Sequence, residues 1–143
     1  NSYRRLLPEY YAPVDTNWGV NHSVVAVRIP ESDANNLRFE HRVAGADANP
    51  FLVTAAIAAG VHYGLKHKCD PGRMVEEGEK VTLKTRIPDR WDKAIDRFAR
   101  SKVLPTYLGE EYCSYYARHR RAESRQFHNV VPATDFDWYL RAV

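Results

Sequence analysis

The residues best suited to chemistry in this sequence lie close together around Glu40. The Glu40 carboxylate is flanked by the guanidinium groups of Arg38 and Arg42. In an extended strand side chains alternate between faces, so these three point to one side while Phe39 and His41 point to the other. Two interpretations fit the pattern. It is either a solvated cross-strand charge pattern, or a ligand surface whose carboxylate holds a metal ion and whose arginines hold carboxylate or phosphate oxygens.

Another arginine interrupts an apolar strand. Residues 24–30 are rich in valine and isoleucine on both faces, which predicts a buried strand that Pro30 ends. Arg28 lies inside this strand, where a guanidinium is costly unless it meets an anion. The alternative is a position at the exposed end of the strand, from which the side chain reaches water. Residues 37–43 predict the next strand, and we expect the two strands to pair as a hairpin.

Helices are expected after the strands. Asn49 as N-cap and Pro50 at the first helical position predict a helix over 50–68. The start of this helix is apolar nearly all round, which predicts that it is buried. Asp89 is expected to cap a helix over 90–101, with apolar residues at core spacing.

The remaining sequence predicts two more helices. The longer one covers 106–128 and is expected to pack inward through Leu108, Tyr112, Tyr115 and Tyr116. Its arginines are interpreted as a solvated face that complements the helix dipole rather than as a nucleic-acid contact. A short helix over 135–141 carries apolar side chains that we expect to dock on a partner subunit or on the core.

Composition restricts the class of protein. The 143 residues are 44% hydrophobic with a net charge of +3, which indicates one globular domain and gives no support for nucleic-acid binding. Cys69 and Cys113 are far apart in sequence, which favours two reduced thiols in a cytoplasmic protein. No apolar run is long enough for a membrane span. The sequence starts at Asn1 without an initiator methionine, and we expect it to be the C-terminal part of a larger protein.

Several motifs in register carry a family resemblance. They are Asn1-Ser-Tyr-Arg-Arg-Leu, Tyr10-Tyr-Ala-Pro, Val27-Arg-Ile-Pro, Glu40-His-Arg-Val-Ala-Gly-Ala-Asp-Ala-Asn-Pro and the closing Asp137-Trp-Tyr-Leu. In order and spacing, along essentially the whole chain, they resemble the C-terminal part of the glutamine synthetase family. The variants Arg4-Arg5, Trp18-Gly-Val and His41-Arg-Val-Ala-Gly are most similar to the γ-glutamylpolyamine (γ-glutamylputrescine) synthetase branch, whose members couple amines other than ammonia to glutamate.

The resemblance implies a reaction and a role for each matching residue. The family uses ATP to phosphorylate the γ-carboxylate of glutamate, and an amine then displaces the phosphate, chemistry that depends on positioning and charge neutralisation. By resemblance, Arg5 and Arg42 bind the substrate glutamate and Arg28 meets the ATP phosphates, as a catalytic residue. Arg38 lies near the nucleotide, and Glu40 binds Mg²⁺ or Mn²⁺.

Two positions depart from the family pattern. Tyr11 stands where glutamine synthetases carry a glutamate, in the flap that closes on ammonium, and an aromatic side chain there favours a larger amine. Ser23 stands where the family has an arginine that contacts the transferred phosphoryl group. Loss of such a contact can cost orders of magnitude in rate. A protonated His22 would be a partial substitute.

The leading hypothesis is an ATP-dependent ligase that joins glutamate to ammonia or to an amine. Within this class, a ligase that uses a polyamine is favoured. The alternatives are glutamine synthetase proper and a non-catalytic assembly subunit of the same fold, which Ser23 would explain. The expected fold is α+β over residues 1–143, an antiparallel sheet covered by helices, as the C-terminal portion of the catalytic domain. Family members form dodecamers from two rings, so a homo-oligomer is expected at full length. The remaining metal ligands lie upstream in the family, so we expect this chain alone to be inactive.

Overall fold

A small mixed sheet carries the two predicted strands and one that was not predicted. The computed structural model describes residues 2–8, 10–80 and 86–141. In the order β1-β2-β3, β1 (Trp18–Val20) pairs in parallel with β2 (Val27–Ile29), which pairs antiparallel with β3 (Glu40–His41). The α+β class and the predicted pairing of the two strands are therefore confirmed. The sheet is mixed, because the aromatic segment at Trp18 adds a parallel neighbour.

Both predicted strands are shorter than expected. In the segment before β2, the Ala26 amide donates to the Asn17 side chain at 3.2 Å, and the Ala26 carbonyl accepts from the Arg42 amide at 2.9 Å. The predicted burial is confirmed for Val25 and Ala26 but not for β2 itself, whose three residues are half-buried. The sequence did not predict that the Ala26 amide donates to the Asn17 side chain, so that only the Ala26 carbonyl continues the pairing with the residues after β3.

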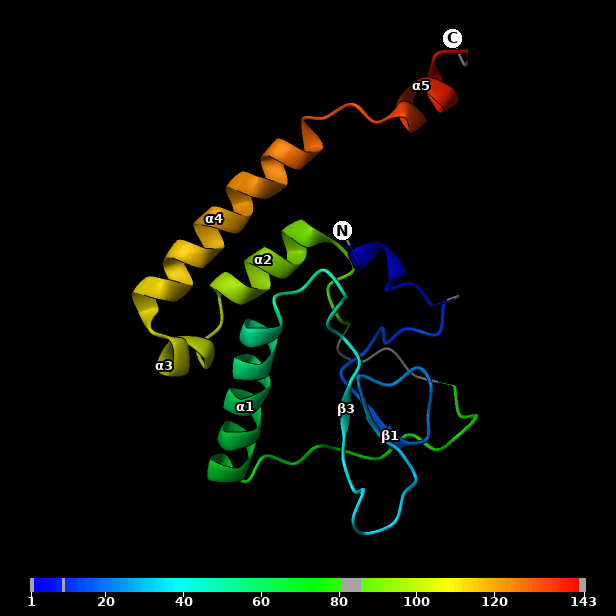
Figure 1. Cartoon of the computed structure of the whole chain (residues 1–143), viewed down its shortest axis with the longest axis vertical. Helices are drawn as coiled ribbons and strands as arrows, with labels where there is room; N and C mark the ends of the chain where they lie inside the picture. Colours follow the sequence, from blue (N-terminus) through cyan, green and yellow to red (C-terminus); the bar gives the residue numbers. More distant parts are fainter. Residues whose placement is uncertain (1, 9, 81–85, 142–143) are drawn as a thin grey trace.

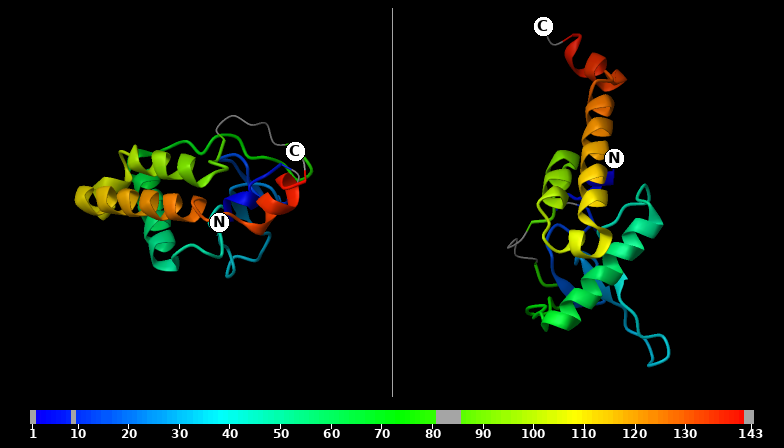
Figure 2. Two further views of the ribbon diagram at one scale, coloured as in Figure 1. Left: turned by 90° about the horizontal axis from the view of Figure 1, so that it is seen from above. Right: turned by 90° about the vertical axis from the view of Figure 1, so that its left-hand side faces the viewer.

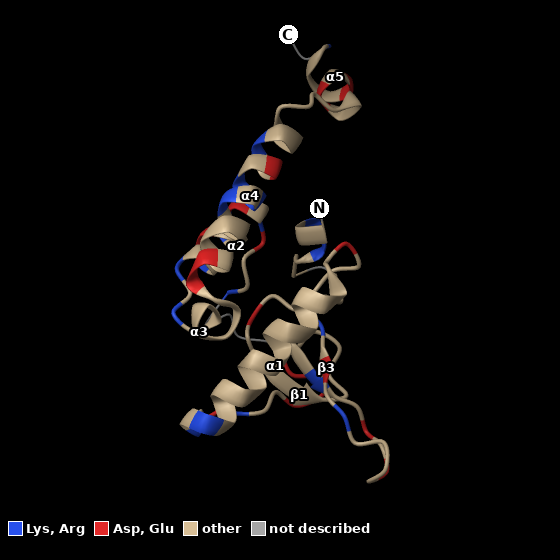
Figure 3. Cartoon of the chain, turned by 60° about the vertical axis from the view of Figure 1, so that its left-hand side comes forward, with Lys and Arg blue, Asp and Glu red and all other residues tan. Residues whose placement is uncertain are grey.

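The helix α1 (Pro50–His67) begins as predicted. The Asn49 side chain accepts hydrogen bonds from the amides of Phe51 and Leu52, and Pro50 occupies the first turn. The prediction that its start is buried is wrong: Phe51 is 83% exposed, and Leu65 near the other end is 76% exposed. The described elements cover only one stripe of α1, which stands beside the sheet with its charge confined to its C-terminal end (Figures 1 and 3).

The predicted helix over 106–128 is divided in two. Gly109, at φ +88°, separates α3 (Leu104–Leu108) from α4 (Glu110–His128). This backbone conformation favours glycine and ends the first helix. Of the tyrosines expected to point inward, Tyr116 packs on Phe98 with ring centroids 5.2 Å apart, whereas Tyr115 is exposed.

The helix α2 (Trp91–Ala99) lies along α4 (Figure 2). Ile95 of α2 is buried, and so are Cys113 and Ala117 of α4. The expected Asp89 cap is absent: its side chain pairs with Arg86 at 3.0 Å and with Lys93 at 2.8 Å. Two cations thus compete successfully with the helix amides for this carboxylate.

The last helix, α5 (Ala133–Tyr139), extends away from the rest of the chain beyond α4 (Figure 1). Phe136, Trp138 and Leu140 are exposed. The expectation that these residues dock on the core of this chain is wrong, while docking on a partner subunit stays a prediction. None of the helices within the described ranges combines the length and apolarity needed to cross a bilayer.

A second group of buried residues joins the N-terminal turn to the sheet. The 3₁₀ turn η1 (Ser2–Arg5) leads into Leu6, which packs with Ala12, Ala26 and Ile87. These apolar contacts hold η1 against the end of β3. Three segments far apart in the sequence thereby reach one place, where the candidate functional residues lie.

Truncation of Ile95 should weaken the contact between α2 and α4. We expect Ile95→Ala to lower the free energy of unfolding by about 2–5 kcal/mol, because a buried side chain is lost and a cavity remains. Leu65→Ala, at an exposed position of α1, should change it by less than about 0.5 kcal/mol. Urea unfolding of both variants measures the difference. Equal effects would contradict the packing described here.

Candidate functional site

The charged residues of β2 and β3 form one cluster. Arg28 lies opposite Glu40 in the register, with Nη1 of Arg28 3.5 Å from Oε2 of Glu40. Nη2 of Arg38 lies 3.8 Å from Oε1 of the same carboxylate. We call Arg28, Arg38 and Glu40 the Glu40 cluster. The structure thus brings together three of the residues predicted from sequence, two cations around one anion.

The described residues satisfy the hydrogen-bonding groups of Arg28 only in part. Its Nε is buried and has no hydrogen-bond acceptor among the described residues. A buried donor left unpaired costs free energy. The anion that the guanidinium meets is Glu40, whose carboxylate lies 3.5 Å from Nη1. Of the two interpretations of Arg28, the contact with an anion is the one this geometry favours.

Arg42 contacts different groups from the Glu40 cluster. It lies just beyond β3, so strand alternation no longer sets its direction. Its Nη1 donates to the carbonyl of Ser23 and more weakly to that of His22 at 3.5 Å, and its Nη2 donates to the carbonyl of Tyr11 at 3.3 Å. We call Arg42 with these three carbonyls the Arg42 network. It connects residues 11–15, which we call the Tyr11 segment, with the turn at residues 22–23 before β2.

Arg5 approaches the same strand end from η1. Its Nη2 donates to the carbonyl of Arg42 at 3.3 Å and to that of Val43. The two arginines predicted to bind one substrate are therefore joined through the backbone that directly follows β3. Arg5 and Arg42 are both half-buried, which leaves each guanidinium partly accessible.

His22 does not supply the cation that Ser23 lacks. The His22 ring is buried; its Nδ1 accepts from the Val24 amide at 3.3 Å, and Nε2 lies 3.1 Å from the Glu79 carbonyl. Both ring nitrogens contact backbone groups inside the chain, so in this structure the buried His22 ring is not presented to a phosphate.

The loop between β3 and α1 is fixed by the N-terminal turn. Asp47 accepts from the Ser2 hydroxyl at 2.5 Å and from the Ser2 amide at 3.1 Å. These bonds, the hydroxyl first, lower the pKa of Asp47 from 3.8 to about 2. Gly45 packs so closely on Ser2 that a Cβ there would collide with the serine side chain. The connection between β3 and α1 is thus held in place.

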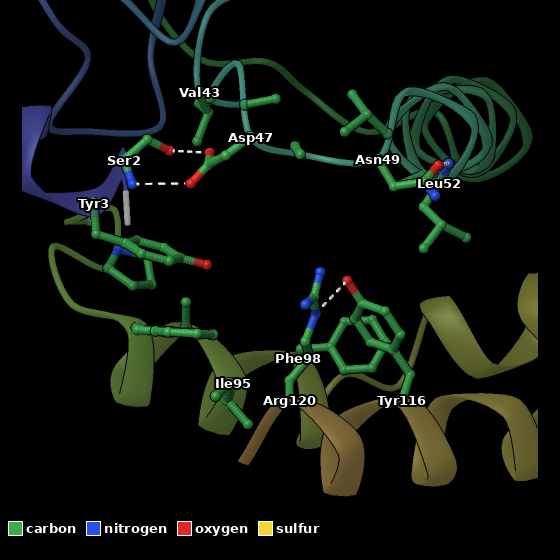
Figure 4. A pocket seen from close by; sticks show the side chains of 18 of the residues that line it. Ser2, Tyr3, Val43, Asp47, Asn49, Leu52, Ile95, Phe98, Tyr116 and Arg120 are labelled. Atoms are coloured by element: carbon green, nitrogen blue, oxygen red, sulfur yellow. Dashed lines mark hydrogen bonds between the residues drawn. The ribbon is translucent and has the colours of Figure 1, made fainter. Parts of the chain in front are cut away.

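A cavity of about 610 Å³ lies beyond this loop, between η1 and the helices α1, α2 and α4 (Figure 4). Its wall is mostly apolar, and its main cation, Arg120, is already paired with Glu123 and with the Tyr116 hydroxyl. Desolvation, and secondarily the Arg5 guanidinium, lower the pKa of His41 at its edge. This cavity offers no unpaired charge for catalysis, so the charged surface of β2 and β3 is the better candidate.

A divalent metal ion would find few ligands here. Over 2–8, 10–80 and 86–141, the structure gathers no group of three histidine, cysteine or acidic side chains that could hold one. Glu40 offers a single carboxylate that two arginines already neutralise. Mg²⁺ takes six oxygen ligands and Mn²⁺ prefers similar donors, so the residues present fit a metal only as a minor part of its coordination.

The sequence indicates side chains of the candidate site but not their backbone acceptors. The carbonyls of Tyr11, Ser23 and Val43 accept from the two arginines, and every residue carries a carbonyl, so no residue type marked them. The sequence indicates these backbone acceptors only indirectly, because two arginines that meet at the end of a short strand must either find hydrogen-bond acceptors or remain exposed to water.

Comparison with known proteins gives one consistent family. The family described as "Glutamine synthetase, catalytic domain" matches residues 1–139. Gamma-glutamylputrescine synthetase of Escherichia coli is 40% identical over 141 residues, covering 99% of this chain, and type-1 glutamine synthetase 2 of Dictyostelium discoideum is 34% identical over 149 residues, covering 100%. The chain spans only 30% and 28% of the lengths of these two relatives.

A solved structure supports the fold. The cryo-electron microscopy structure of Plasmodium falciparum glutamine synthetase superimposes with a TM-score of 0.80 at 18% identity, over 97% of this chain and 36% of that one. At this identity the likeness concerns the fold alone. It agrees with the α+β arrangement of sheet and helices described above.

Removal of the Glu40 charge should leave the fold intact. Its ion pairs are about one-third exposed or more on both sides, and such pairs contribute about 0–1 kcal/mol. We expect Glu40→Gln to lower the free energy of unfolding by less than about 1 kcal/mol in urea titrations. A loss above about 3 kcal/mol would mean that the carboxylate is a structural buried partner instead.

The contact between Ser2 and Asp47 predicts a dependence of stability on pH. The folded-state pKa of Asp47 is about 2 and its unfolded value 3.8, so its contribution is complete above the higher value and is lost as the pH falls toward the lower one. Asp47→Asn should remove this part of the acid sensitivity, and Ser2→Ala should reduce it. Urea midpoints across this pH range measure the effect, and unchanged acid sensitivity in both variants would contradict it.

Proposed function

This chain belongs to the glutamine synthetase family, and on that premise we propose that it forms part of the catalytic domain of an ATP-dependent ligase that joins glutamate to an amine. One observation carries the proposal. The Glu40 cluster and the Arg42 network occupy neighbouring positions at the pairing of β2 with β3, so phosphate-type and carboxylate-type ligands would meet there. Arginine suits both ligands, because its planar fork matches their paired oxygens.

The proposed reaction has two steps, and in the first the arginines would bind different groups. In the first, an oxygen of the glutamate γ-carboxylate attacks the γ-phosphorus of ATP, a new P–O bond forms, and the bond to ADP breaks. Arg28 and Arg38 would neutralise the phosphate oxygens, and their guanidinium groups, which are partly exposed beside Glu40, support this role. Arg5 and Arg42 would hold the carboxylates of glutamate in the position from which attack occurs.

In the second step the amine nitrogen attacks the acyl carbon of γ-glutamyl phosphate. The C–O bond breaks, phosphate leaves with its electron pair, and the nitrogen loses a proton. Glu40 would contribute one ligand to Mg²⁺ or Mn²⁺, which, when bound, neutralises charge on the phosphates. The described residues gather no further ligands, and the family resemblance assigns the others to a part of the protein upstream of this chain. We therefore propose that the chain alone lacks ligase activity.

Tyr11 supports an amine larger than ammonia. Its side chain is 82% exposed while its carbonyl is bound by Arg42, so the ring is available to a ligand. An aromatic face attracts an alkylammonium group, whereas a carboxylate would favour a small cation. The name of the Escherichia coli relative agrees with this choice.

Two other functions remain candidates on specific observations. The glutamine synthetases among the relatives favour ammonia as the amine. Ser23, which is exposed and offers only its carbonyl to Arg42, favours a non-catalytic subunit that keeps the fold for assembly. A homo-oligomer, as in the family, is part of the proposal in each case.

The choice of amine is tested with the chain in a polypeptide of the length of its relatives. With glutamate and ATP, we expect phosphate release with putrescine to exceed that with ammonia. Tyr11→Glu should shift the ratio of kcat/KM for ammonia over putrescine upward by about tenfold or more, because a carboxylate stabilises a compact cation. Tyr10→Glu adds the same charge one residue away and should leave the ratio unchanged.

Each contrary result points to a different function. Preference of the parent protein for ammonia would replace the polyamine ligase with a glutamine synthetase. Absence of turnover with every amine, in a protein that folds, would support the assembly subunit.

A further inference from the structure

The Tyr11 segment is anchored on one side and held by Arg42 on the other. Residues 12–15 are buried directly after the exposed Tyr11, and the Val14 carbonyl accepts from the Ile87 amide at 3.0 Å. The anchored residues fix where the segment ends but not the position of its tip. At Tyr11 itself, the guanidinium of Arg42 binds the carbonyl at 3.3 Å.

The same guanidinium fixes a second loop. Its Nη1 donates to the carbonyls of Ser23 and His22, in the turn that precedes β2. Arginine has five N–H donors, and these three bonds use three of them. Nε and one N–H of Nη2 remain for a ligand carboxylate. Arg42 can therefore hold both loops and a substrate at the same time.

A lysine at this position could not do the same. The arginine fork spreads its donors in one plane, so one side chain reaches acceptors on two separate loops. An ammonium group concentrates its donors at a single point. The bond from Arg5 to the Arg42 carbonyl further restricts the backbone from which this fork extends.

From these contacts we infer that Arg42 is also a positioning residue for the amine site. It fixes the Tyr11 carbonyl and the 22–23 turn, so that binding of glutamate at Arg42 and placement of the amine at Tyr11 are coupled. This inference rests on the proposed function for its substrates. Its structural part, that Arg42 holds the two loops together, rests on the hydrogen bonds alone.

The test compares Arg42→Lys with Arg5→Lys in the polypeptide of full family length. Both arginines are proposed to bind glutamate, but only Arg42 contacts Tyr11. We expect Arg42→Lys to raise the KM for putrescine about tenfold or more, in addition to the KM for glutamate, since a charged hydrogen bond that positions the amine site is lost. Arg5→Lys should raise the KM for glutamate with a much smaller effect on the amine.

Amide hydrogen exchange gives a readout that does not depend on turnover. In Arg42→Lys, exchange should accelerate in residues 10–12 and 22–24 together, while α2 and α4 keep their protection. Arg42→Gln serves as the second variant should the lysine variant not fold. An unchanged KM for the amine beside a raised KM for glutamate would overturn the inference and leave the proposed function standing. If the parent protein turns over no amine, the proposed function fails, and unaltered exchange at both loops would overturn the structural part as well.

Discussion

The register of β2 against β3 is the constraint on which the candidate site depends. It places Arg28 opposite Glu40, and the bond from the Arg42 amide to the Ala26 carbonyl extends the same register by one residue. A slip of one residue would turn His41 toward Arg28 and Glu40 toward the apolar cavity. The Glu40 cluster and the Arg42 network would then both be lost, although no residue would have changed.

Much of the site could be predicted from sequence because its side chains are chemically distinctive. Arg28 in an apolar strand and the alternation around Glu40 each carried a physical argument, and the cap at Asn49 followed from local chemistry. The break at Gly109 was missed because a glycine between two helical patterns can be tolerated or can end a helix. The tertiary structure, not the local sequence, decides between the two.

Burial was harder to predict than secondary structure. The start of α1 is apolar enough for a core, yet Phe51 is exposed, because burial depends on elements that pack against a helix and not on the helix itself. The predicted helix cap at Asp89 is wrong for a related reason, because Arg86 and Lys93 bind the carboxylate that would otherwise accept from the helix amides. The acceptors of Arg42 are backbone carbonyls, which no residue pattern reveals.

In the proposed mechanism, arginine side chains carry most of the electrostatic stabilisation of a phosphoryl transfer. Ser23 provides no charge and the His22 ring is buried, so the proposed mechanism assigns the phosphate to Arg28 and Arg38. Transfer through γ-glutamyl phosphate can be followed with an oxygen isotope, because one oxygen of the glutamate γ-carboxylate must end in the released phosphate. With glutamate labelled with ¹⁸O in its γ-carboxylate, the protein of full family length, ATP and putrescine should release phosphate that carries one ¹⁸O atom per turnover. Product formed with unlabelled phosphate would contradict the proposed mechanism, because the glutamate oxygen would then never have bonded to phosphorus.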